Sequence, residues 1–187
     1  MEIVENIRIA NGVALVNDRP FFSTVEKEFK IFGKSLYKHL GISYPKYYKM
    51  SPLSQLGFLA SEILLKNQDV CSLDPELVSL LFANSSSSLH TDSIYQKTLE
   101  TTPSPATFVY TLPNIVIGEI CIRNGFRGEG VFFIQESFDK EFIFDQAEAL
   151  LSSGRSVRCL AGWLEVDMEG DYLADLSLLK YEGPINE

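Results

Sequence analysis

The chain has 187 residues, of which 45% are hydrophobic and 22% are charged, and it contains 12 glycines and 8 prolines. This composition is typical of a folded globular domain and excludes a collagen, a coiled coil and a disordered chain. Sixteen basic residues against 25 acidic ones give a formal charge of −9, which repels a nucleic-acid backbone or an anionic membrane surface. We therefore expect one compact domain over residues 1–187 that does not bind nucleic acid.

An acidic ligand needs a local group of basic side chains, because the chain as a whole is negative. The sequence offers two such groups. One consists of Lys27, Lys30 and Lys34, and the other pairs Arg123 with Arg127.

The cysteines are three in number, far apart and set among apolar neighbours, at Cys71, Cys121 and Cys159. This usage indicates buried free thiols in a reducing compartment, not a disulfide framework. No CxxC pair or histidine stands at metal-ligand spacing, so we assign no metal and no cofactor. The first residues are acidic, and no apolar run approaches the about 18–20 residues that cross a bilayer. We expect a cytoplasmic protein without a membrane span.

The first third of the chain carries two local signals. Residues 7–10 and 13–16 flank Asn11-Gly12, a dipeptide that favours a tight turn between two strands, although 13–16 could also be a loop. Ser51-Pro52 is a strong helix start, and apolar residues follow it at helical spacing as far as Leu64. We predict a helix with a buried face after residue 51.

The middle third is predicted to hold a buried strand and two helices. Residues 77–83 form a nearly continuous apolar run that ends in a serine-rich loop, which is typical of a parallel strand covered on both faces. Asp92 can cap a short helix over 93–99, and the Thr/Pro/Ser segment 101–105 interrupts the chain. A buried helix is expected after Pro113-Asn114.

The last third alternates strands and a helix. Residues 125–130 form a glycine-rich turn, 131–134 a short strand and 139–151 a helix that Gly154 ends. Two strands are then expected over 157–166 and 172–181. This alternation predicts an α/β protein.

Several segments, in this order, resemble one known family. The segment 48–62 begins Tyr-Lys-Met-Ser-Pro and continues as a helix that ends in acidic residues, and segment 103–128 leads through Pro113-Asn114 to Gly125-Phe126-Arg127-Gly128. With the segments 147–154, 160–165 and 174–182, they resemble the N-terminal half of a β-ketoacyl-acyl-carrier-protein synthase, of the thiolase-like superfamily.

The resemblance implies a fold and a partner. The family stacks two similar halves, so it implies that this chain is a single thiolase-like half, with a five-stranded mixed sheet flanked by helices. Strands that face a second half would leave apolar surface, and apolar patches beyond a few hundred Å² mark partner sites. The expected partner is a second copy of the chain or a full-length synthase, and acyl carrier protein is a further expected partner.

The resemblance also locates the family's nucleophile, a cysteine nine residues after the turn glycine and ten before a helix alanine. Counting from Gly128 and back from Ala147 gives Ser137 in both cases. A serine needs an adjacent general base, and neither His39 nor His90 matches the family's catalytic histidines, which lie in its second half. Condensing activity is therefore expected to be absent.

The neighbours of Ser137 support this expectation and leave two alternatives open. Glu136 would add negative charge beside a developing oxyanion, and Gln135 resembles the glutamine that chain length factors carry near the cysteine position. The favoured interpretation makes Ser137 the N-cap of a helix that begins near Phe138, and the alternative gives it a covalent role.

The two histidines and a group of phenylalanines are further candidate residues. His90 follows a predicted parallel strand, at the kind of edge where α/β proteins bind ligands, but a solvated loop histidine is favoured. His39 is expected on the surface. Aromatic rings near the turn could line an acyl tunnel, but core or interface packing is favoured; they belong to Phe132, Phe133, Phe138, Phe142 and Phe144.

Three functions follow from these features. The first is a non-condensing partner or scaffold in fatty-acid, polyketide or aryl-polyene-type synthesis. The second is an acyltransferase or 3-oxoacyl-acyl-carrier-protein synthase that uses Ser137 or residues supplied by another subunit. The third is non-covalent binding of acyl chains or acyl carrier protein, through residues that include Phe132, Phe133, Phe138, Arg123 and Arg127.

Overall fold

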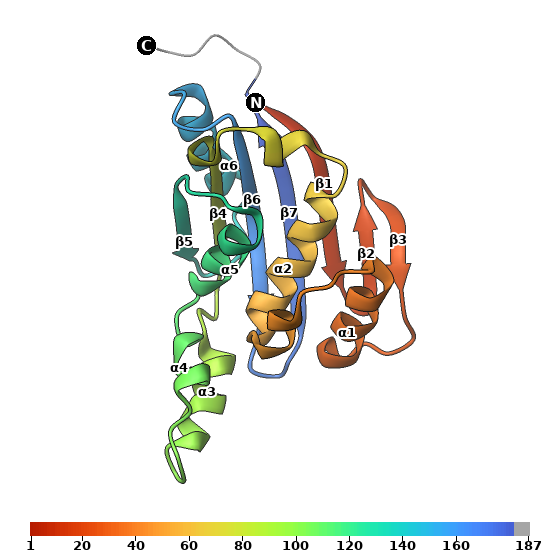
Figure 1. The fold of residues 1–187 in the computed structure, drawn as a ribbon, viewed down its shortest axis with the longest axis vertical. Coiled ribbons are helices and arrows are strands. Elements are labelled where there is room, and N and C mark those ends of the chain that lie inside the picture. The colour runs from red at the N-terminus through yellow and green to blue at the C-terminus, as the bar shows by residue number, and fades with distance from the viewer. Residues whose placement is uncertain (182–187) are drawn as a thin grey trace.

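A mixed β-sheet forms the centre of the computed structural model, which describes residues 1–181 (Figure 1). Within these residues the sheet has seven strands in the order β3-β2-β1-β7-β6-β4-β5. Strand β4 pairs in parallel with β5 and β6, and the other neighbours are antiparallel. The strands are β1 (Glu2–Ala10), β2 (Val13–Val16), β3 (Arg19–Ser23), β4 (Val78–Asn84), β5 (Gly130–Ile134), β6 (Arg158–Val166) and β7 (Tyr172–Lys180).

The expectation of five strands is wrong, because β2 and β3 extend the sheet beyond β1. Asn11 and Gly12, with φ of 49° and 79°, close the turn between β1 and β2. Asn17 and Asp18, with φ of 49° and 61°, close the next turn. Two consecutive positive φ angles match the right-handed twist of a hairpin, so the segment 13–16 is a strand and the chain returns once more as β3.

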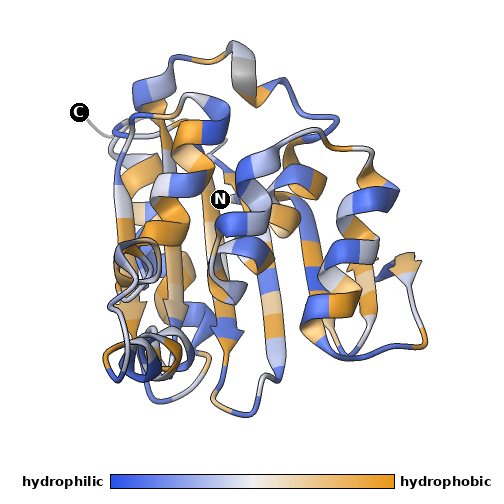
Figure 2. Ribbon diagram, turned by 60° about the horizontal axis from the view of Figure 1, so that its bottom comes forward, coloured by the Kyte–Doolittle hydropathy of each residue, from blue (hydrophilic) through white to orange (hydrophobic). Residues whose placement is uncertain are grey.

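Helices cover both faces of the sheet. Figure 1 shows α1, α2 and α5 on one face and α6 behind the other, while α3 and α4 extend past the end of the sheet. In Figure 2 the helices alternate hydrophobic and hydrophilic stretches, as expected for helices that cover a sheet. The helices are α1 (Phe29–Leu40), α2 (Pro52–Leu65), α3 (Leu89–Thr98), α4 (Pro105–Val109), α5 (Ile115–Asn124) and α6 (Lys140–Ser152), with short 3₁₀ turns η1 (Pro45–Lys49), η2 (Asp69–Ser72) and η3 (Pro75–Leu77).

Helix α2 is the most deeply buried helix of the part that the structure describes. Its predicted start is confirmed, because the Ser51 hydroxyl accepts a hydrogen bond from the Ser54 N–H and proline follows at the first helical position. Of its residues, all but Pro52, Gln55 and Glu62 are buried. The sheet, α1 and α5 thus cover α2 on nearly all sides within this one chain.

Helices α1 and α4 are absent from the sequence-based prediction, and the remaining elements follow it apart from two caps. Strand β4 is buried along its whole length and parallel to both neighbours, as predicted. Helix α3 begins earlier than expected, after Ser88, and Asp92 lies in its first turn, where its carboxylate accepts a hydrogen bond from the Ser88 hydroxyl. The side chain that caps α6 is Asp139, which accepts from the Phe142 N–H at 2.9 Å, and not Ser137.

Candidate functional site

The carboxyl ends of the parallel strands meet at one edge of the sheet, which is where α/β proteins bind ligands. At the end of β4, the Asn84 side chain exchanges two hydrogen bonds with the Ser87 backbone, at 2.8 and 2.9 Å. Glu165, near the end of β6, accepts from the Ser85 N–H and hydroxyl, both at 2.7 Å. The serine-rich loop is therefore fastened to β4 and β6, and it fixes where α3 begins.

Ser137 lies on the exposed turn between β5 and α6. The Gln135 N–H donates to the Asn84 carbonyl at 2.9 Å, while the Gln135 side-chain oxygen is buried and lacks a hydrogen-bond partner within the described residues. Within the described residues, the Ser137 hydroxyl takes part in no hydrogen bond. The turn thus presents a serine without a general base beside Glu136, which is also exposed.

The two histidines lie on helices α1 and α3. His39 is on α1, where its ring lies tilted against that of Phe22 with the centroids 4.8 Å apart, and it is exposed as expected. His90 is in the first turn of α3, not in a loop, and its Nδ1 is buried without a partner in the described chain. Neither forms a nucleophile–base pair with Ser137.

The aromatic cluster divides between the two faces of the sheet. Phe133 packs edge-on against Phe142 at 5.1 Å, and Phe138 packs against Trp163 at 5.4 Å, both in the core under α6. Phe144 belongs to the same core, but Phe132 packs into the core on the opposite face. Neighbouring residues of a strand point to opposite faces, so Phe132 and Phe133 cannot line one tunnel wall together.

The predicted basic groups differ in how far their charge is compensated. Arg123 is engaged with Glu62 by two hydrogen bonds, at 2.8 and 3.0 Å, which raise the pKa of Arg123, and it lies over the Tyr44 ring. Arg127 is exposed and has no ion-pair partner in the described chain. Lys30 and Lys34 lie one turn apart on α1 and line a shallow surface groove.

The cysteines show no sign of activation. Burial raises the pKa of the Cys159 thiol to about 12 and also raises the pKa of the half-buried Cys121, whereas reactive cysteines have lowered values. The side chain of Cys71 lies outside the described residues. Within residues 1–181, no three metal-ligating side chains cluster, and none of the helices has the length and apolar character that crossing a bilayer demands.

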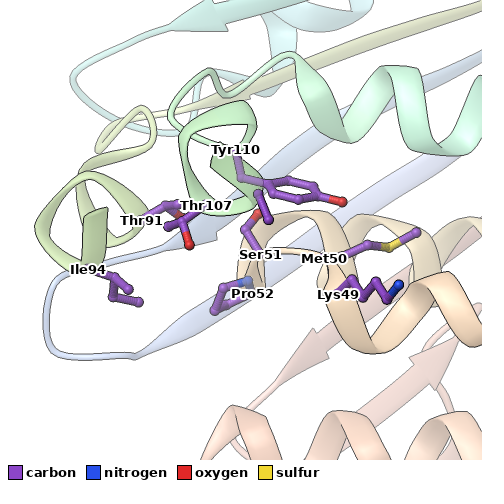
Figure 3. Close-up of a pocket in the computed structure, with 9 residues that line it drawn as sticks. Lys49, Met50, Ser51, Pro52, Thr91, Ile94, Thr107 and Tyr110 are labelled. Carbon is purple, nitrogen blue, oxygen red and sulfur yellow. The ribbon is translucent and has the colours of Figure 1, made fainter. Parts of the chain in front are cut away.

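A groove that the sequence did not reveal runs between the start of α2 and α3 (Figure 3). Its smaller part, of ≈ 180 Å³, lies among Lys49, Ser51, Thr91, Thr107 and Tyr110. Its larger part, of ≈ 370 Å³, lies among Phe29, Lys30, Gln55, His90 and Val166. Met50, Pro52 and Ile94 line both parts, so the two hollows adjoin.

Comparison with known proteins identifies the fold of the chain. No family model matches the chain, and no curated protein matches it. Solved structures that match it include ketosynthases with their chain length factors and a β-ketoacyl synthase, so the chain shares the mixed α/β fold of these proteins. The resemblance predicted from the sequence is thereby confirmed for the fold.

Three of the matching structures are two ketosynthase complexes and a β-ketoacyl synthase. A ketosynthase in complex with its chain length factor from Xenorhabdus doucetiae has a TM-score of 0.64 and 15% identity, over 97% of this chain and 79% of that one. A polyketide-synthase acyl-carrier protein in complex with its hexaketide-bound ketosynthase gives 0.67 and 15%, over 95% and 61%. A β-ketoacyl synthase from Burkholderia phymatum gives 0.60 and 13%, over 96% and 58%. The chain thus spans less than two thirds of two of these three chains.

Proposed function

We propose that this chain is a synthase-like domain that does not condense acyl groups and acts as a partner or scaffold subunit in fatty-acid or polyketide synthesis, including the aryl-polyene type. The observation that carries the proposal is the turn after β5. There Ser137 stands where the resemblance places a cysteine, and the described chain supplies no hydrogen bond to its hydroxyl. The expected setting is the cytoplasm.

The chemistry of the turn supports this role. A serine hydroxyl is a weak nucleophile unless a base accepts its proton, and a base has to lie within hydrogen-bond reach. Glu136 adds negative charge beside the turn, which opposes the oxyanion of an acyl-transfer intermediate. Two of the solved structures of this fold are described as a ketosynthase together with a chain length factor, which supports pairing with a synthase.

The two edges of the sheet differ in a way that favours partner binding at β5. Strand β3 carries Arg19 and Pro20 and is offset by a bulge against β2, and such features protect an edge from pairing. Strand β5 reads Gly-Val-Phe-Phe-Ile, has neither charge nor proline, and leaves Ile134 54% exposed. We place the contact with a second copy or a full-length synthase at this edge.

The test is the intact mass of the protein after incubation with malonyl- and medium-chain acyl carrier protein, alone and with a candidate full-length synthase. We expect no adduct on the wild type or on Ser137→Ala. An adduct that forms on the wild type and is lost in Ser137→Ala would overturn the proposal and make the chain an acyltransferase. Association with the synthase, measured in the same mixtures by sedimentation, is expected to survive Ser137→Ala.

A further inference from the structure

We propose that the groove between α2 and α3, named here the α2–α3 groove, binds a small amphipathic carboxylate. Its residues are those of the two adjoining hollows, joined at Met50, Pro52 and Ile94. None of them belongs to the turn that carries Ser137. The inference is therefore independent of whether that turn performs chemistry and of whether β5 binds a partner.

The size and lining of the groove fit a ligand with an apolar body. The larger hollow, at ≈ 370 Å³, lies within the range of small-molecule sites, about 300–1,000 Å³. Phe29, Met50 and Val166 are themselves at least nine-tenths buried, at 5%, 6% and 4% exposure, so they form a fixed apolar base. Ile94 is 42% exposed and forms the opposing wall from α3.

The charges of the groove favour an anionic end. In a chain of net charge −9, the charged side chains of the lining are Lys30 and Lys49 against one carboxylate, that of Glu28. Within the described residues, neither lysine has an ion-pair partner. A charge-assisted hydrogen bond to a carboxylate is stronger than a neutral one, so an acid is favoured over its neutral amide.

The walls are held in place before any ligand arrives. The capping bond from the Ser54 N–H to the Ser51 hydroxyl fixes the start of α2. On the other side, the Tyr110 hydroxyl donates to the buried Glu119 carboxylate at 2.8 Å, and the Lys46 ammonium lies 2.7 Å from the other oxygen of that carboxylate. Burial and the bond to Glu119 raise the pKa of Tyr110, so this hydroxyl keeps its proton. In a preformed site, little binding free energy is lost to the ordering of the walls.

The test uses octanoate and octanamide as probes, titrated into the full chain and followed by calorimetry and by amide NMR shifts. We expect one octanoate per chain, with shifts centred on residues 50–55 and 90–94, and binding of octanamide that is at least about 10-fold weaker. Equal affinity for the two probes, or shifts that lie elsewhere, would overturn the proposal.

Matched variants locate the site. Ile94→Trp is expected to fill the shared wall and to weaken octanoate binding at least about 10-fold, whereas Ile122→Trp, at a position on α5 that is 67% exposed, leaves it unchanged. Lys30→Glu is expected to weaken binding similarly, and Lys34→Glu, one turn further along α1 and outside the lining, less than about 3-fold. Equal effects within either pair contradict the assignment, and far-UV circular dichroism verifies that all four variants fold.

Discussion

At the scale of the residue, Gly162 in strand β6 leaves no room for a side chain. Its φ is +150°, and a β-carbon added there would collide with the carbonyl oxygen of Asp175 and lie 2.9 Å from the Leu176 Cα, both in the backbone of β7. We predict that Gly162→Ala lowers the free energy of unfolding by about 2–5 kcal/mol, because it adds overpacking to backbone strain. Urea unfolding measures the change.

The matched control is Gly118→Ala on the exposed side of α5, where an added β-carbon meets no atom within 4 Å. Alanine is the better helix former there, so the free energy of unfolding should rise by about 0.5–1 kcal/mol. Similar midpoints for the two variants would show that the close approach of β6 and β7 does not constrain residue 162.

Because of Cys159, we expect the stability of the protein to depend on pH in the alkaline range. Burial raises the pKa of its thiol from 9.0 to about 12, so the unfolded chain loses this proton first as the pH rises. The buried, neutral thiol makes its full contribution to the free energy of unfolding below pH 9. Between pH 9 and 12 this contribution falls by up to about 1.4 kcal/mol per pH unit. We predict that Cys159→Ala flattens the loss of stability between pH 9 and 10, measured by urea unfolding.

Cys121→Ala is the comparison for this slope, because the Cys121 side chain is only half-buried. It should retain most of the wild-type dependence on pH. A slope that Cys159→Ala leaves unchanged would mean that the thiol of Cys159 does not lose its proton more easily in the unfolded chain.

At the scale of the element, the edges of the sheet lead to a prediction about association. We predict that Ile134→Lys weakens self-association at least about 10-fold, since lysine on an edge strand opposes pairing. Ile134 is already 54% exposed, so the change should not unfold the chain. Ser23→Lys, on the opposite edge strand, is the control and should leave the sedimentation profile unchanged. A wild type that stays monomeric at every concentration would refute self-association through β5.

Most elements follow from local signals in the sequence, but helices α1 and α4 and strand β3 are not among the predicted ones. The turn at Asn11-Gly12 and the helix start at Ser51-Pro52 are encoded in neighbouring residues, and both are present. Strand β3 contains Pro20, which weakens a strand pattern, and it becomes a strand by pairing with β2. The cap of α6 was misplaced by two residues, because Ser137 and Asp139 are both good capping residues.

The two candidate sites, the Ser137 turn and the α2–α3 groove, also differ in how far the sequence predicts them. The place of Ser137 on a turn between a strand and a helix could be predicted, because β5 and α6 flank it directly in the chain. The α2–α3 groove could not be predicted, since its residues come from five separate segments, 28–30, 49–55, 90–94, 106–110 and 166–170. The fold brings these segments together, and no local pattern records their contact.

At the scale of the whole molecule, one sheet is shared by two cores. The larger core lies under α1, α2 and α5, and the smaller lies under α6, with residues of β4 and β6 in both. Because adjacent residues of the same strands serve both cores, losing one core removes the support of the other. We therefore expect the chain to unfold as a single cooperative unit.

Trp163 makes this cooperativity measurable, because it is the chain's single tryptophan, is 4% exposed and lies in the smaller core against Phe138. Its fluorescence reports on the core under α6, and far-UV circular dichroism reports on all the helices and strands. We predict that the two signals change at the same urea concentration. Fluorescence that changes first would show that the α6 layer unfolds separately, and that the turn carrying Ser137 is less stable than the α2–α3 groove on the opposite face.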